Sequence, residues 1–169
     1  KAHITTHYKP EVIRKYFGNG KEIGIDISYI NEEQPLGTAG SLASISAADN
    51  KPFLVTNGDI LTKVNYHAMF EFHKRQRADL TVAMRNHEIN FPYGILECCD
   101  FKIKSVEEKP LLSFLVNAGI YIVEPSVLDL IPKKTVFHMT DLIKLLIEQD
   151  RNVVGFPIHE YWLDIGKPA

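Results

Sequence analysis

The sequence predicts one α/β domain over residues 1–169, with a mostly parallel β-sheet and flanking helices. Two short apolar runs, 53–57 and 115–123, have the composition of buried strands. Segments with helical spacing of apolar residues alternate with such strands, which is typical of α/β proteins. The chain shows no repeat, linker or low-complexity segment. These observations together favour a single domain.

Composition excludes several classes of protein. The chain has 45% hydrophobic and 24% charged residues, which is ordinary for a globular protein. A net charge of −2 argues against general nucleic-acid binding, which needs a basic face. No apolar run approaches the roughly 18 residues that span a membrane. The two cysteines, Cys98 and Cys99, are adjacent, so we expect free thiols in a reducing cytoplasm.

The first part of the chain is expected to contain two helices around one strand. Pro10 in a first turn and Gly18 as a stop suit a helix. Alternating isoleucines predict a strand, and a turn of small residues opens a second helix. The expected ranges are a helix over 6–17, a strand over 23–30, and a helix from the turn at 35–40 to about Ala48.

The second part continues the alternation and adds a hairpin. Apolar spacing and turn residues place its elements. Thr140, or Asp141 after it, can cap the last helix. The expected ranges are a helix over 65–76, a strand over 79–84, a β-hairpin over 95–106, a strand over 114–123, a short helix over 125–130, a helix to Glu148, and a strand over 153–158.

Asp59 is the first candidate for a metal-binding residue. It follows the strand at 53–57 in the turn Asn57-Gly58-Asp59. In open α/β sheets ligands bind outside the carboxyl ends of strands, which places Asp59 at the mouth of a crevice. A carboxylate there suits Mg²⁺, which takes oxygen ligands and shares substrate phosphates. Turn formation alone explains the same three residues, and taken by itself it is the commoner explanation.

Three further features leave alternatives open. The small residues of 36–40 let a ligand approach the backbone of a helix start, or simply form an N-cap turn. Asn117 and the following Ala-Gly mark either a site of close approach or a β-bulge within a strand. His67 and His73 are six residues apart and do not share a helix face, so we expect surface or packing roles.

Six motifs in a fixed order resemble the sugar-phosphate nucleotidylyltransferase family, especially its branch related to mannose-1-phosphate guanylyltransferase. The resemblance spans essentially the whole chain. The motifs are Pro35-Leu36-Gly37-Thr38-Ala39-Gly40, Asn57-Gly58-Asp59, Tyr93-Gly94, Glu108-Lys109-Pro110, Asn117-Ala118-Gly119-Ile120-Tyr121 and Trp162-Leu163-Asp164-Ile165-Gly166.

The resemblance implies a Rossmann-like fold and one reaction. A sugar 1-phosphate, mannose 1-phosphate or a similar one, attacks the α-phosphorus of a nucleoside triphosphate, expected to be GTP, and pyrophosphate leaves. Such a reaction needs two polyanions aligned and their charge neutralised. The resemblance makes Mg²⁺ the cofactor and Asp59 and Asp164 its two protein ligands. No protein nucleophile is needed, because the phosphate itself attacks.

The resemblance also assigns substrate contacts. Lys109 matches the position that holds the sugar's phosphate, and a flexible point cation suits that role. The remaining expected contacts are Glu108, Asn117, Tyr93 and Gly94 around the sugar, and Glu32, Leu36, Gly37, Gly40 and Gly58 around the nucleotide. The segment Glu107-Glu108-Lys109 is also typical of a solvated hairpin end with a weak ion pair. We expect Trp162 to pack beside the metal ligand.

One departure from the family concerns the N-terminus. The family begins with a central strand followed by a glycine-rich loop that cradles the triphosphate, and no such segment precedes the strand at 53–57. We therefore expect that this chain is part of a longer product and lacks turnover alone. We also expect an open sheet edge, which could pair with a second copy to give a homodimer.

Two other functions are alternatives to the enzyme. A non-catalytic or regulatory domain would keep the sugar-phosphate pocket without turnover. A glycosyltransferase with a related sheet would carry an Asp-x-Asp metal motif, and Asn57-Gly58-Asp59 lacks the first aspartate.

Overall fold

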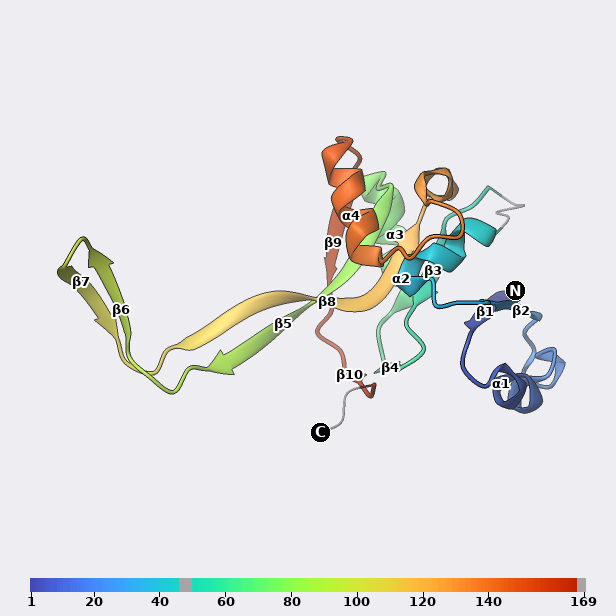
Figure 1. The fold of residues 1–169 in the computed structure, drawn as a ribbon, viewed down its shortest axis with the longest axis horizontal. Helices are drawn as coiled ribbons and strands as arrows, with labels where there is room; N and C mark the ends of the chain where they lie inside the picture. Colours follow the sequence, from blue (N-terminus) through green and yellow to red (C-terminus); the bar gives the residue numbers. More distant parts are fainter. Residues whose placement is uncertain (46–49, 167–169) are drawn as a thin grey trace.

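A four-stranded sheet forms the centre of the computed structural model, which describes residues 1–45 and 50–166 (Figure 1). The strand order is β3-β8-β5-β9, with bounds Phe53–Thr56, Leu111–Val123, Leu80–Asn90 and Val153–Pro157. β8 runs antiparallel to both β3 and β5, whereas β9 is parallel to β5. The sheet is therefore mixed, not mostly parallel, because β8 returns from a hairpin directly beside β5.

Helices cover both faces of this sheet, which confirms the α/β class. α3 (Tyr66–Gln76) and α4 (Met139–Glu148) pack on opposite faces, because successive side chains of a strand point to opposite sides. The cluster under α4 includes Leu80, Val82, Tyr121, Val123, Leu142 and Leu146. The cluster under α3 includes Met69, Ala83, Ala118, Ile120 and Ile122.

The N-terminal part forms a unit of its own. β1 (Ala2–Thr6) pairs in parallel with β2 (Ile27–Asn31), with α1 (Pro10–Phe17) and a 3-10 helix (Lys21–Ile23) between them. Within the described residues neither strand joins the four-stranded sheet.

Both N-terminal elements start later than predicted. The helix expected from 6 begins at Pro10, because Lys9 adopts a left-handed conformation and residues up to Thr6 pair in a sheet. The strand expected from 23 begins at Ile27, because Gly24 has a positive φ of 72° that ends the preceding turn.

The helix expected from the 35–40 turn to Ala48 is shorter than predicted. α2 (Gly37–Gly40) has four residues and continues as a 3-10 helix over Ser41–Ser44. Residues 46–49, including Ala48, lie outside the described residues.

A long two-stranded ribbon leaves the core. β5 and β8 stay paired as far as Asn90 and Leu111, and the ribbon carries the hairpin of β6 (Ile95–Cys99) and β7 (Lys102–Glu107) at its far end (Figure 1). The hairpin confirms the prediction for 95–106. β5 extends to Asn90 where a strand ending at Met84 was expected, because the pairing with β8 continues past the core.

The remaining elements follow the predicted order. Asn65 caps α3 by accepting a hydrogen bond from the Ala68 N–H at 3.0 Å. A 3-10 helix spans Pro125–Leu130, and β4 (Ile60–Thr62) pairs antiparallel with β10 (Trp162–Asp164). None of the helices in the described residues is long and apolar enough to cross a membrane.

His73 is a packing residue, as expected. It is buried on α3, and its ring nitrogens lie 2.7 Å from Thr81 Oγ1 and 3.2 Å from Glu124 Oε1.

Candidate active site

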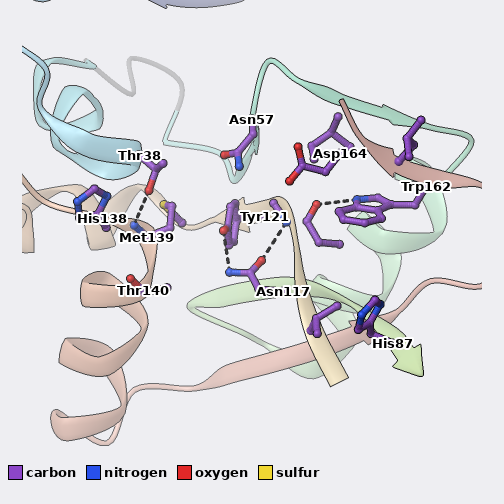
Figure 2. A pocket seen from close by; sticks show the side chains of 15 residues that line it. Thr38, Asn57, His87, Asn117, Tyr121, His138, Met139, Thr140, Trp162 and Asp164 are labelled. Carbon is purple, nitrogen blue, oxygen red and sulfur yellow. Dashed lines mark hydrogen bonds between the residues drawn. The ribbon is translucent and has the colours of Figure 1, made fainter. Parts of the chain in front are cut away.

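A cavity of about 590 Å³ opens where β3, β8, α4 and β10 meet (Figure 2). Figure 2 shows Tyr121 and Asn117 in the middle of the cavity, with Thr38 and His138 on one side and Asp164 and Trp162 on the other. The lining residues are Thr38, Asn57, Ile60, His87, Val116, Asn117, Ala118, Gly119, Tyr121, His138, Met139, Thr140, Trp162, Leu163 and Asp164. The cavity thus lies at the carboxyl end of β3, where the turn at 57–59 begins.

Asp164 lines one edge of this cavity, and Asp59 lies beside Asp164 just outside the lining. Antiparallel pairing of β4 and β10 places Asp164 opposite Ile60, the residue after Asp59. The Ile165 N–H also donates to the Asp59 carbonyl at 2.9 Å. A methyl group built on Gly166 would overlap Asp59 Oδ2 and lie 3.3 Å from Asp164 Oδ1. The two carboxylates therefore face the same small space, and both side chains are half-buried.

This pair fits a magnesium ion chemically. Both groups are hard oxygen donors, and Mg²⁺ in proteins is often held by one or two carboxylates, with substrate phosphates and water completing its octahedron. Among the described residues no group of three or more His, Cys, Asp or Glu side chains could form a complete protein cage. Two carboxylates therefore suit a metal that takes its remaining ligands from a substrate and from water.

Asn117 is held rigidly in the floor of the cavity. Its Nδ2 donates to the Tyr121 hydroxyl at 2.8 Å, and its Oδ1 accepts from the Gly119 N–H at 2.9 Å. Gly119 has a φ of 72°, and the pairing of β5 with β8 shifts register between Val82 and Met84. The strand therefore bulges here. Burial raises the pKa of the Tyr121 hydroxyl, and the hydrogen bond with Asn117 offsets this only in part.

The glycine turn at 36–40 packs against protein. A Cβ on Gly37 would lie 2.7 Å from the Phe137 carbonyl, and one on Gly40 would lie 2.8 Å from the Thr135 carbonyl. The Glu32 carboxylate accepts a hydrogen bond from the Leu36 N–H at 3.2 Å. Because Gly37 and Gly40 have no side chain, the backbone that precedes α4 can pack closely against them, and a ligand is not needed to explain these glycines.

The four ribbon residues of the expected site lie away from the cavity. Tyr93, Gly94, Glu108 and Lys109 sit where the ribbon joins the β6–β7 hairpin, and none of them lines the cavity (Figure 1). Gly94 adjoins Glu108, since a Cβ on it would lie 2.9 Å from Glu108 Oε2. Lys109 Nζ is 4.0 Å from Glu108 Oε1, and both side chains are mostly exposed. The structure thus brings these four together, but Asn117 alone of the sugar-side residues lines the cavity.

Two cavity residues, Thr38 and His138, were not predicted as site residues, although Thr38 belongs to the motif at 35–40. Thr38 Oγ1 accepts a hydrogen bond at 2.9 Å from the Met139 N–H, which joins the starts of α2 and α4. Thr38 and His138 line the cavity because of this contact between segments far apart in the chain. Trp162 could be foreseen as a packing residue, and it is half-buried against the cluster under α3.

A second hollow, of about 960 Å³, lies between β1 and β3, and we call it the β1–β3 slot. Glu32, Gly37, Gly58 and Asp59 line it together with residues of both strands. Thr38 and Asn57 line both the slot and the first cavity. Asp59 and Asp164 therefore stand where the two spaces meet.

Comparison with known sequences gives one consistent result. The profile of the nucleotidyl transferase family matches residues 1–169. The chain is 31% identical to mannose-1-phosphate guanylyltransferase of Mycobacterium tuberculosis and 32% identical to mannose-1-phosphate guanyltransferase of Schizosaccharomyces pombe. Each alignment covers 98% of this chain and 48% of the relative. The chain thus spans about half the length of these curated relatives.

Solved structures share the fold. HddC from Yersinia pseudotuberculosis superposes with a TM-score of 0.70 at 24% identity, over 98% of this chain and 73% of that one. A second structure of HddC, complexed with GMP-PN, gives the same TM-score. A putative glucose-1-phosphate thymidylyltransferase from Bacillus anthracis reaches 0.71 at 21% identity, over 98% of this chain and 70% of the other.

Proposed function

This chain belongs to the nucleotidyl transferase family, and we propose that it carries the sugar-phosphate and metal side of a nucleotidylyltransferase site. The donor is GTP and the acceptor is mannose 1-phosphate or a close analogue, in keeping with the guanylyltransferases to which the chain is similar. The observation that carries the proposal is the meeting of Asp59 and Asp164 at the cavity edge. The exposed, unpaired Cys98 and Cys99 agree with a cytoplasmic location.

The reaction is a displacement at phosphorus. A phosphate oxygen of the sugar 1-phosphate forms a bond to the α-phosphorus, the bond from that phosphorus to the bridging oxygen breaks, and pyrophosphate leaves with the electron pair. Asp59 and Asp164 would hold Mg²⁺, which would neutralise the charge of the phosphates. Asn117 presents a fixed amide to a sugar hydroxyl, because two hydrogen bonds already orient it.

Lys109 binds the phosphate of the sugar, and Glu108, Gly94 and Tyr93 complete the sugar contacts. This part of the proposal requires the ribbon to bend toward the cavity, since the four residues lie at its far end (Figure 1). Lys109→Ala should then raise the KM for the sugar 1-phosphate and leave the KM for GTP unchanged. Lys104→Ala, an exposed lysine on β7, is the matched control. Equal kinetics for the two variants would remove Lys109 from the site.

The β1–β3 slot takes a further β-strand. Successive residues of a strand turn their backbone N–H and C=O groups to opposite edges. In β1 the Ala2 N–H and the Thr6 carbonyl bond toward β2, so those of His3 and Thr5 face the slot. In β3 the Asn57 N–H bonds to β8, so those of Leu54 and Thr56 face the slot. The backbone groups of these four residues would pair with the added strand.

The strand comes from polypeptide outside the 169 residues and brings the triphosphate cradle. Among the described residues, 1–45 and 50–166, no Lys or Arg lines the first cavity, and Lys1 and Lys51 are the two that line the slot. Such a surface offers little positive charge for a triphosphate. The same observation favours a second candidate, a non-catalytic domain that binds a nucleotide sugar without turning it over.

A side-by-side assay tests the proposal. The 169-residue chain and a longer version carrying the residues encoded before Lys1 are supplied with Mg²⁺, GTP and mannose 1-phosphate, and pyrophosphate release and molecular size are measured. We expect turnover from the longer version alone. Robust turnover by the 169-residue chain would contradict the need for an added strand. A dimer of that chain would favour a second copy, in place of the added strand, as the occupant of the slot. Nucleotide-sugar binding without turnover in both would favour the non-catalytic domain.

A further inference from the structure

Asp164 stands on a strand that is weakly held by its own sheet. β10 spans three residues, and its strand partner is β4, also of three residues, in a two-stranded sheet. Isolated two-stranded pairings are marginal in water. A metal ligand on such a strand needs other contacts to hold it against the main sheet.

Trp162 and Arg85 supply these contacts. The indole Nε1–H donates to the carbonyl of Ala118 on β8 at 2.8 Å. Arg85 on β5 donates from Nη1 to the Trp162 carbonyl at 2.6 Å. The guanidinium carbon of Arg85 also lies 5.6 Å from the centroid of the Trp162 ring. Strands β5 and β8 of the main sheet are therefore both bonded to the same residue of β10.

The bonded positions link the two halves of the candidate site. Ala118 is buried and stands between Asn117 and Gly119, at the bulge that orients the Asn117 amide. Trp162 is two residues before Asp164, so both side chains point to the same face of β10. The hydrogen bond from the Trp162 indole to Ala118 thus fixes the distance between the Asp164 carboxylate and the Asn117 amide.

We infer that Arg85 and Trp162 are positioning residues that hold Asp164 in register with Asn117, an inference that rests on the proposed function. Arg85 touches no substrate in this role; it acts through the Trp162 backbone. Loss of its guanidinium leaves β10 held mainly by its three-residue pairing with β4, and so short a pairing is marginal in water and can slip. The Asp164 carboxylate then moves relative to Asp59, and metal affinity falls.

Trp162 is the only tryptophan in the sequence, so its fluorescence reports on the contact directly. The first measurement is acrylamide quenching of the 169-residue chain and of Arg85→Gln. The matched control is Arg75→Gln, because the Arg75 guanidinium lies 5.8 Å from the Phe72 ring in an equivalent pair on α3. We expect stronger quenching in Arg85→Gln alone, with unchanged circular dichroism in both variants. Quenching equal to that of the unchanged chain would overturn the proposed contact.

The second measurement is Mn²⁺ binding, followed by electron paramagnetic resonance of the free ion, since Mn²⁺ prefers the same oxygen ligands as Mg²⁺. Mutation of residues that orient metal ligands typically lowers affinity by about 10- to 100-fold. We expect the Mn²⁺ affinity to fall at least about tenfold in Arg85→Gln and in Trp162→Phe, and to recover in part in Arg85→Lys. The Mn²⁺ affinity of Arg75→Gln should equal that of the unchanged chain. Changed quenching with unchanged Mn²⁺ affinity would overturn the positioning role. If Asp164→Asn binds Mn²⁺ as the unchanged chain does, the metal site itself fails, and the positioning role with it.

Discussion

Replacing Gly119 by alanine tests the conformation at the centre of the cavity. Gly119 has a φ of 72°, and a Cβ there would lie 2.9 Å from Asn57 Nδ2 and 3.2 Å from Asn57 Cγ. A non-glycine residue in the left-handed region costs roughly 1–2 kcal/mol. For a chain of this size that free energy corresponds to a fall in Tm of about 2–8 °C. Displacement of the Asn57 side chain adds to the backbone cost.

The assay is urea unfolding followed by Trp162 fluorescence and circular dichroism. Gly58→Ala is the control, because its Cβ would meet nothing within 4 Å and its φ is not positive. We expect Gly58→Ala to leave the free energy of unfolding nearly unchanged and Gly119→Ala to lower it by at least the backbone cost of roughly 1–2 kcal/mol. In the Asn57→Ala/Gly119→Ala double variant the steric part is relieved and the backbone part remains. Equal stability of Gly119→Ala and Gly58→Ala would refute the strained bulge.

Two further predictions concern stability and substrate binding. Burial opposes ionisation of Asp79, but hydrogen bonds from Arg151 and the Asn152 N–H hold its pKa below the usual value. A lowered folded pKa stabilises the protein above the unfolded pKa of about 3.9, and this contribution is lost as the pH falls through the folded pKa. Asp79→Asn should therefore cost about 1.5–3 kcal/mol at pH 7, with a difference that shrinks below pH 4 in pH-dependent urea unfolding. Tyr121→Phe removes the acceptor of the Asn117 amide. The KM for sugar 1-phosphate in the version that turns over should therefore rise by about fivefold, equivalent to a hydrogen bond of roughly 1 kcal/mol, with kcat little changed. An unchanged KM would show that Tyr121 does not orient Asn117 for the substrate.

Local patterns in the sequence predict much of the fold. The helix at 65–76 carries its own cap in Asn65, and the hairpin at 95–106 alternates regularly, so both are found where expected. α4 begins at Met139 with His138 as its N-cap, two residues before the predicted cap Thr140. The Met139 N–H bonds to Thr38, 101 residues away, which the local sequence could not show. The strand Ala2–Thr6 was missed because its pairing partner lies beyond α1. Contacts between distant segments decide these details.

The candidate site divides in the same way. Asp59, Asn117 and Asp164 could be predicted because each belongs to a motif at a strand end or bulge. The order of motifs could not show that Gly37 and Gly40 face the backbone of residues 135–137. Sequence spacing also could not reveal that β5 and β8 stay paired to Asn90 and Leu111, which carries Lys109 away from the cavity.

The central claim is that Asp59 and Asp164 share one metal ion in nucleotidyl transfer. The measurement is pyrophosphate release, against Mg²⁺ concentration, by the version that turns over and by its Asp59→Asn, Asp164→Asn and double variants. When two residues act as a unit, the effects of replacing them do not add. Each single variant should therefore lose about 100-fold or more in kcat, and the double variant should lose little more than either single variant. Near-normal turnover in either single variant, or losses that simply multiply in the double, would contradict a shared metal.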